Sequence, residues 1–172
     1  TADLEGGYGD APETIRKAIG VGVVGANLED QLKPLDEAVA QVEAVMRAAA
    51  DEGVPDFVLN ARTDAYVLGA DDPLQEARTR GLAYLEAGAP TVFVPGPLDE
   101  ASIETLVEAF GPQRLTVIGL PGVPAPSRLE ALGVARVSYG PMSQRVALTA
   151  LAELVEAVHA DGGVPGGTRP LN

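Results

Sequence analysis

The feature that most constrains the fold is a regular alternation of short β-branched runs with longer segments of helical periodicity. Proline with acidic residues at several helix starts, and glycine at several helix ends, support this alternation. The residues Ala2 to Leu4 are typical of the end of a further strand. The other predicted strands are Val23–Leu28, Phe57–Ala61, Thr91–Val94, Leu115–Ile118 and Val134–Ser138, and the predicted helices are Pro12–Ile19, Leu35–Ala50, Pro73–Ala87, Glu100–Phe110, Ser127–Leu132 and Gln144–Ala160.

Six strand–helix units predict an α/β fold with a parallel sheet covered by helices. Two architectures accommodate them, an open doubly wound sheet and a TIM-type (β/α)8 barrel. Polar residues follow consecutive strands in order, and only a barrel gathers consecutive strand ends around one mouth, so the barrel is favoured. A whole barrel needs about 250 residues. We therefore expect one or two strand–helix units to be missing before Thr1, a barrel domain over residues 1–160, and a flexible tail rich in Gly and Pro over 161–172.

Composition excludes several functions. A formal net charge of −13 predicts no nucleic-acid partner and no anionic membrane partner. The chain has neither an apolar run long enough to span a membrane nor a signal-peptide pattern, so we expect a soluble, cytoplasmic protein. Cysteine is absent, which excludes disulfides, thiolate metal sites and a cysteine acid or nucleophile. The only histidine, His159, lies near the end of the last predicted helix, so acid–base chemistry is left to carboxylates, tyrosines or lysines.

Charged residues follow the first three predicted strands. Asp3 and Glu5 lie at the end of the first and Glu29 directly follows the second, which predicts a site for a hard cation. The third strand ends in Arg62 and Asp64, and the planar fork of an arginine beside an acid suits an anionic ligand held next to a metal. The alternatives are ordinary helix caps and loop acids, with Arg62 and Asp64 forming only a local salt bridge.

Four segments resemble the isocitrate lyase and phosphoenolpyruvate mutase superfamily. They occur in the family's order over nearly the whole chain. The segments are TADLEGGYG at residues 1–9, NLEDQ at 27–31, NARTDAY at 60–66 and GVARVSYGP at 133–141.

The resemblance implies a barrel whose mouth binds Mg²⁺, with Mn²⁺ as an alternative, together with a small 2-oxo or 2-hydroxy acid or a phosphonate. It also implies that a carbon–carbon or carbon–phosphorus bond is made or broken through a pyruvate enolate, in a homo-oligomer that is a tetramer or a dimer. Carried over by motif, the metal site comprises Asp3, Glu5 and Glu29, and the substrate-binding residues are Gly6, Gly7, Tyr8, Asn60 and Arg62. Asp3 would bind the metal directly, whereas Glu5 and Glu29 would hold it mainly through its waters.

The chain departs from the cysteine-dependent lyases of this superfamily. Their mobile loop carries Lys-Lys-Cys-Gly-His after the Glu-Asp-Gln segment, whereas here only Leu32, Lys33 and Pro34 separate Gln31 from the next predicted helix. The resemblance is therefore to the phosphoenolpyruvate mutase-like branch. Lys33 takes the place of the shortened loop and joins Arg62 and Glu29 as a catalytic candidate, although solvation of a surface lysine is the alternative. An alternative hypothesis is a catalytically silent barrel that binds metal and carboxylate or acts as an assembly protein.

Overall fold

The computed structural model describes residues 1–169 and divides the chain into two compact units, Thr1–Ser138 and Tyr139–Asn172. The predicted barrel domain over 1–160 and tail over 161–172 stay predictions, and residues 170–172 of that tail lie outside the described residues.

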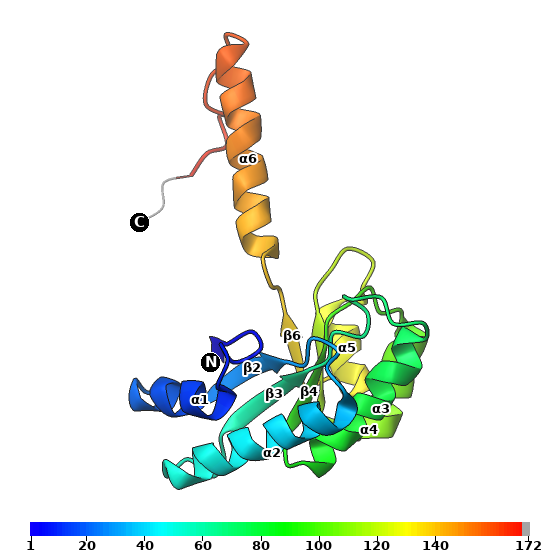
Figure 1. Cartoon of the computed structure of the whole chain (residues 1–172). Helices are drawn as coiled ribbons and strands as arrows, with labels where there is room; N and C mark the ends of the chain where they lie inside the picture. Colours follow the sequence, from blue (N-terminus) through cyan, green and yellow to red (C-terminus); the bar gives the residue numbers. More distant parts are fainter. Residues whose placement is uncertain (170–172) are drawn as a thin grey trace. The chain divides into compact units, whose positions relative to one another are not determined.

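The first unit alternates strands and helices (Figure 1). Three of its helices begin at an aspartate whose side chain accepts a backbone N–H of the first turn, at Asp10, Asp72 and Asp99. The elements are β1 (Ala2–Asp3), α1 (Ala11–Gly20), β2 (Gly25–Glu29), α2 (Leu35–Asp51), β3 (Val58–Arg62), α3 (Pro73–Glu86), β4 (Thr91–Val94), α4 (Glu100–Phe110), β5 (Leu115–Ile118), α5 (Pro126–Leu132) and β6 (Arg136–Ser138).

The strand order distinguishes the two architectures. All neighbouring strands are parallel, and they pair in chain order from β1 to β6. A doubly wound sheet would reverse its strand order at a switch point, whereas a barrel does not. Each helix from α1 to α5 packs beside the next, which places them in one layer around a curled sheet. The predicted TIM-type barrel is therefore confirmed as a partial barrel, open between β1 and β6 within the described residues.

Two strands differ in their bounds from the prediction in a way that matters for the site. The N–H of Val23 bonds to the carbonyl of Ala18, so Val23 still belongs to the turn that closes α1, and β2 begins at Gly25. β2 continues to Glu29 and β3 to Arg62, each further than predicted. Glu29 and Arg62 are therefore the last residues of their strands.

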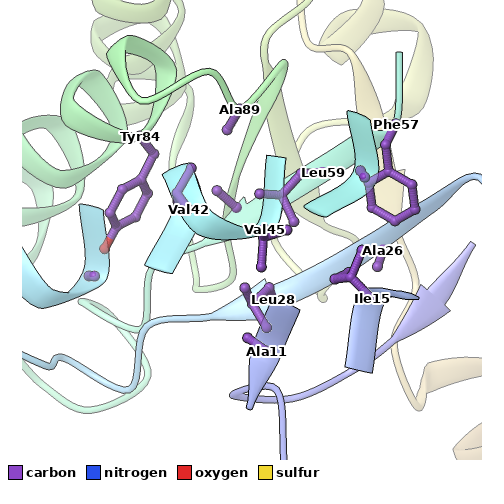
Figure 2. Close-up of a cluster of buried hydrophobic side chains, with 13 residues drawn as sticks. Ala11, Ile15, Ala26, Leu28, Val42, Val45, Phe57, Leu59, Tyr84 and Ala89 are labelled. Carbon is purple, nitrogen blue, oxygen red and sulfur yellow. The ribbon is translucent and has the colours of Figure 1, made fainter. Parts of the chain in front are cut away.

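Alternation along the strands separates apolar from polar side chains. Ala26, Leu28, Leu59 and Ala61 are buried in a core cluster shared with the helices. Figure 2 shows Leu28 and Leu59 near Val45, with Tyr84 at the edge of the cluster. Asn27, Glu29, Asn60 and Arg62 occupy the alternate positions, so the concave face of the sheet is polar over β2 and β3.

The second unit, Tyr139–Asn172, contains one helix, α6 (Met142–His159), among the described residues. Its helix has no buried residue, and Val146, Leu151 and Val155 are among its exposed apolar side chains. Among residues 1–169, no helix combines the length and the apolar character that a membrane crossing needs.

Candidate functional site

An ion pair joins the ends of β2 and β3. Glu29 and Arg62 are paired in the strand register, and Arg62 Nη1 lies 2.8 Å from Glu29 Oε2. The other carboxylate oxygen of Glu29 accepts a hydrogen bond from Gln31 Nε2 at 3.3 Å. Both partners of the pair are largely shielded from water, at 22% and 16% side-chain exposure, and shielding strengthens their attraction.

A second carboxylate orients the same guanidinium. Arg62 Nε donates to Asp64 Oδ1 at 2.7 Å, and Asp64 is buried. Burial raises the pKa of Asp64, as do the nearby charges of Glu29 and Asp30, while Arg62 opposes this rise. The described contacts of Arg62 use Nε and one side of Nη1, which leaves one N–H of Nη1 and both N–H groups of Nη2 for the oxygens of a ligand.

The loop after β1 brings two acids to the same edge of the sheet. The N–H of Glu29 bonds to the carbonyl of Glu5 at 2.9 Å, which extends the pairing of the two segments beyond β1. Asp3 and Glu5 are both exposed. Lost hydration raises the pKa of Tyr8, and so do the negative charges of Glu5, Asp3 and Glu29. The three predicted metal carboxylates therefore all lie close enough to influence one phenol.

The donor set is suitable for a hard divalent cation. Asp3, Glu5 and Glu29 offer only oxygen atoms, and Mg²⁺ typically takes one or two carboxylates and completes its shell with water and substrate oxygens. Within residues 1–169 no group of three or more His, Cys, Asp or Glu side chains is gathered into a ready metal site. Glu29 is already paired with Arg62, which suits contact through water more than a direct bond. The chemistry of these donors thus fits the cation, and their role as ligands stays a prediction.

The glycines of the first loop have a packing role. A Cβ on Gly6 would come within 2.9 Å of the Gln31 side chain, and a Cβ on Gly7 would collide with Ala11. Gly7 also has a φ of 92°, which L side chains rarely adopt. Both residues therefore let the loop after β1 approach its neighbours closely, and their predicted contact with substrate stays a prediction.

Asn60 lies one layer deeper in the sheet than Arg62. It is buried, its Nδ2 donates to Asn27 Oδ1 at 2.7 Å, and its Oδ1 accepts from Thr91 Oγ1 at 3.1 Å. Asn60 therefore belongs to a polar row across β2, β3 and β4 beneath the ion pair. Its position supports the floor of the mouth, and its contact with substrate stays a prediction.

Lys33 lines a cavity beside the predicted metal residues. Lys33 Nζ donates to Gln41 Oε1 at 3.3 Å, and Gln41 Nε2 donates to the carbonyl of Gly6 at 3.0 Å. The cavity has a volume of about 560 Å³. It runs between the loops after β1 and β2, and its lining includes Glu5, Gly6, Tyr8, Gln31, Lys33 and Gln41. The structure therefore places Lys33 where it can meet a ligand, next to Glu5 and Gly6.

Sequence reasoning missed a buried polar cluster behind the ion pair. Asp30 is buried and contacts Arg80 and Tyr84, which lie on α3. Asp30 follows Glu29 directly, at a position where the sequence alone fits an ordinary loop acid. A signal for Arg80 was available, because it shares one face of a helix with Ala77, Gly81 and Tyr84, all of them buried. A charged residue on the buried face of a helix indicates a partner in the interior.

Comparison with known proteins supports a common ancestry for this arrangement. Residues 1–159 match the family model of phosphoenolpyruvate phosphomutase. The chain is 34% identical over 181 residues to 2,3-dimethylmalate lyase of Eubacterium barkeri, covering 96% of this chain and 62% of that protein. It is 30% identical over 185 residues to phosphoenolpyruvate phosphomutase of Streptomyces hygroscopicus, covering 95% and 57%. The chain thus spans 57% to 62% of the length of these curated relatives.

A solved structure has the same fold. The crystal structure of a candidate phosphonomutase from Burkholderia cenocepacia J2315 superimposes with a TM-score of 0.81 at 39% identity, over 90% of this chain and 67% of that chain. The named relatives are thus a lyase and mutases that act on small acids.

Proposed function

Because the chain belongs to the phosphoenolpyruvate mutase and isocitrate lyase superfamily, we propose that it is part of a magnesium-dependent lyase or mutase. The substrate is a small 2-oxo or 2-hydroxy acid, or the corresponding phosphonate. The reaction cleaves or transfers a carbon–carbon or carbon–phosphorus bond through a pyruvate enolate.

The observation that carries this proposal is the arginine fixed between two acids at the mouth. Glu29 and Asp64 contact Nη1 and Nε of the planar Arg62 guanidinium, which restricts the orientation of its remaining N–H groups on Nη1 and Nη2. A planar fork matches two oxygens of a carboxylate or phosphonate, which a lysine would not do. Arg62 therefore binds and orients the acidic end of the substrate.

Asp3, Glu5 and Glu29 would hold Mg²⁺ beside that acidic end. The bound cation supplies Lewis-acid stabilisation of the negative charge that develops on the enolate oxygen. Glu29 contacts Arg62 and also accepts a hydrogen bond from Gln31 in the loop after β2. It would therefore keep the anion-binding Arg62 at a fixed position relative to the metal-binding acids. Its substitution should disturb both functions together.

Lys33 is the candidate for acid–base work in a chain without cysteine. Its ammonium group is held by Gln41 at the wall of the cavity and keeps further N–H donors for a ligand. From this position Lys33 protonates or orients the leaving group. The open cavity beside it favours substrates with a group attached to the pyruvate unit, such as a substituted malate, oxaloacetate or a phosphonopyruvate-like acid.

Turnover of these acids tests the proposal directly. The full-length protein, incubated with 2,3-dimethylmalate, oxaloacetate or phosphonopyruvate, should convert at least one of them in the presence of Mg²⁺, with products followed by NMR. Chelation of the metal, or Glu29→Gln, should abolish that conversion. A protein that binds these acids with Mg²⁺ but converts none of them would instead be the silent barrel.

Lys33→Ala tests the acid–base assignment separately. Turnover should fall by roughly 100-fold, which lies in the range of lost general acid–base catalysis. The affinity for Mg²⁺ should stay at the wild-type value, because Lys33 does not belong to the proposed metal residues. Unchanged turnover would remove Lys33 from the mechanism.

A further inference from the structure

The connection between β2 and α2 has an unfavourable backbone conformation. Gln31 and Leu32 have φ values of 51° and 50°, so two successive residues other than glycine are left-handed. Such a conformation costs free energy and persists only where surrounding contacts fix it. This short segment, residues 30–33, follows Glu29 directly and carries Lys33 to the cavity.

The contacts that fix this segment converge on Asp30. Its Oδ1 accepts the N–H groups of Leu32 and Asp64, both at 3.0 Å. Its Oδ2 accepts the hydroxyl of Tyr84 at 2.5 Å and Arg80 Nη1 at 3.2 Å. Asp30 is only 4% exposed, so these four donors replace its hydration.

Arg80 makes a second contact with the same segment. Its Nη1 also donates to the carbonyl of Lys33 at 2.9 Å, while its Nε pairs with Glu76 at 2.6 Å. Arg80 thus holds both ends of the segment, at Asp30 and at Lys33. Burial raises the pKa of Tyr84, as does the charge of Asp30, so its hydroxyl stays protonated as a donor.

The cluster also reaches the anion-binding arginine. Asp64 receives the N–H of Gln31 on Oδ2 at 3.2 Å and Arg62 Nε on Oδ1 at 2.7 Å. The space lined by Asp30, Arg62 and Tyr84 has a volume of only about 10 Å³, too small for a substrate. Arg80 and Tyr84 can therefore influence the mouth only through the residues that they hold.

We propose that Arg80 and Tyr84 are positioning residues of this site: from α3 they clamp Asp30 and the Lys33 carbonyl, and so hold Glu29, Lys33 and Arg62 in their places at the mouth. The effect on ligand binding rests on the proposed function. The effect on the backbone of residues 30–33 does not depend on it.

Amide hydrogen exchange tests the clamp in the full-length protein. The variants are Arg80→Met and Tyr84→Phe, and Arg128→Met is the matched control, because Arg128 pairs with Glu100 on the surface and touches no residue of the mouth. In both clamp variants the amides of Leu32 and Asp64 should exchange roughly tenfold faster, as expected when a buried hydrogen-bond network loses one partner. The amides of Asp30 and Thr63, which bond to neighbouring strands, should keep their rates.

Titration with oxalate, a mimic of the pyruvate enolate, tests the consequence for the site. With Mg²⁺ present, both clamp variants should bind oxalate roughly fivefold to tenfold more weakly than wild type, and Arg128→Met should bind it as wild type does. Tyr84→Phe keeps the aromatic ring in the core, so it decides the matter if Arg80→Met does not fold.

Two results would overturn the proposal. One is exchange at Leu32 and Asp64 within twofold of wild type in folded variants, and the other is faster exchange with unchanged oxalate affinity. A wild-type protein that binds no oxalate would count against the proposed function, and the exchange rates alone would then decide whether Arg80 and Tyr84 fix the segment.

Discussion

The two halves of the curled sheet differ at the edge where the strands end. β2 and β3 end in Glu29 and Arg62, and two acids follow them closely: Asp64 accepts from Arg62, and the Asp64 N–H donates to Asp30. β4 and β5 are followed instead by Pro95, Gly96 and Leu120, without a charged side chain at these positions. Charged and hydrogen-bonded groups therefore gather on one side of the mouth, at β2 and β3, and uncharged residues follow the strands on the other side.

Close packing is prominent in the second half of the sheet, β4 to β6 with its helices, where the described strand ends carry no charged pair. A Cβ on Gly96 would come within 2.6 Å of the Tyr66 side chain, and a Cβ on Gly81 would penetrate the ring of Phe110. The apolar core of this half joins the strands to the helices that cover them. It contains Val92, Val94, Leu115 and Val117 of the strands and buried side chains of α4 and α5. Substitutions should therefore destabilise the protein for different reasons in the two halves: loss of buried polar contacts in the first and overpacking in the second. The following predictions test that difference.

The largest loss of stability is expected for Asp30→Ala. Removal of this carboxylate leaves Arg80 buried without its partner and frees the N–H groups of Leu32 and Asp64, which should cost about 3 to 5 kcal/mol. The control is Asp99→Ala, which removes an exposed cap of α4 in the second half and should cost much less. Urea unfolding measures both. Equal losses of unfolding free energy in Asp30→Ala and Asp99→Ala would show that the buried polar cluster contributes no more to stability than an exposed helix cap.

Arg62→Ala should have the largest effect on ligand binding. Loss of the guanidinium removes the proposed contact with the substrate and leaves Glu29 and Asp64 facing each other without a shared cation, which should weaken oxalate binding by about 2 to 4 kcal/mol. Arg128→Ala, in the second half, should leave the affinity unchanged. Calorimetry compares them. Wild-type affinity in Arg62→Ala would place the anion site elsewhere.

Gly81→Ala tests the close packing of α3 against Phe110 of α4. The added methyl group has no space against Phe110, so we expect a loss of about 1 to 3 kcal/mol from overpacking. Gly20→Ala is the control, since it is also helical and a Cβ there meets no atom within 4 Å. Thermal unfolding should separate the two variants. A neutral Gly81→Ala would mean that α3 and α4 can shift apart without loss.

The smallest effect is a dependence of stability on alkaline pH. Burial, followed by the charge of Asp30, raises the pKa of Tyr84 above its ordinary value of 10.0 in the folded protein. Above pH 10 the unfolded chain therefore loses a proton that the folded chain keeps, and stability falls as pH rises. This contribution to stability is fully present below pH 10. Above pH 10, about 1.4 kcal/mol of stability is lost for each further pH unit. Urea unfolding between pH 9 and 11.5 should show a steeper loss in wild type than in Tyr84→Phe, and parallel slopes would refute the assignment.

Much of the fold was predictable from the sequence because each unit is locally consistent. β4, β5 and α4 have the predicted bounds, since β-branched runs and an aspartate cap define them without help from distant residues. β2 and β6 begin later than predicted. Val23 and Val134 have the composition of strands, but their N–H groups close the preceding helices by bonding to Ala18 and Leu129. Composition alone does not show which partner a backbone group takes.

The site was predictable where its residues lie at strand ends and not where they lie on a helix. Glu29 and Arg62 were found because consecutive parallel strands bring their ends together. Arg80 and Tyr84 contact Asp30 across 50 and 54 residues of chain, a separation that no local pattern reveals. The roles of Asp3, Glu5, Gly6, Tyr8 and Asn60 toward a ligand stay predictions.

The most direct test of the account is calorimetric titration of oxalate into the full-length protein with and without Mg²⁺. We predict binding that requires Mg²⁺, because in the proposed site Asp3, Glu5 and Glu29 would hold the cation while Arg62 would hold the anion. Equally tight binding without any divalent cation, or no binding in either condition, would contradict it.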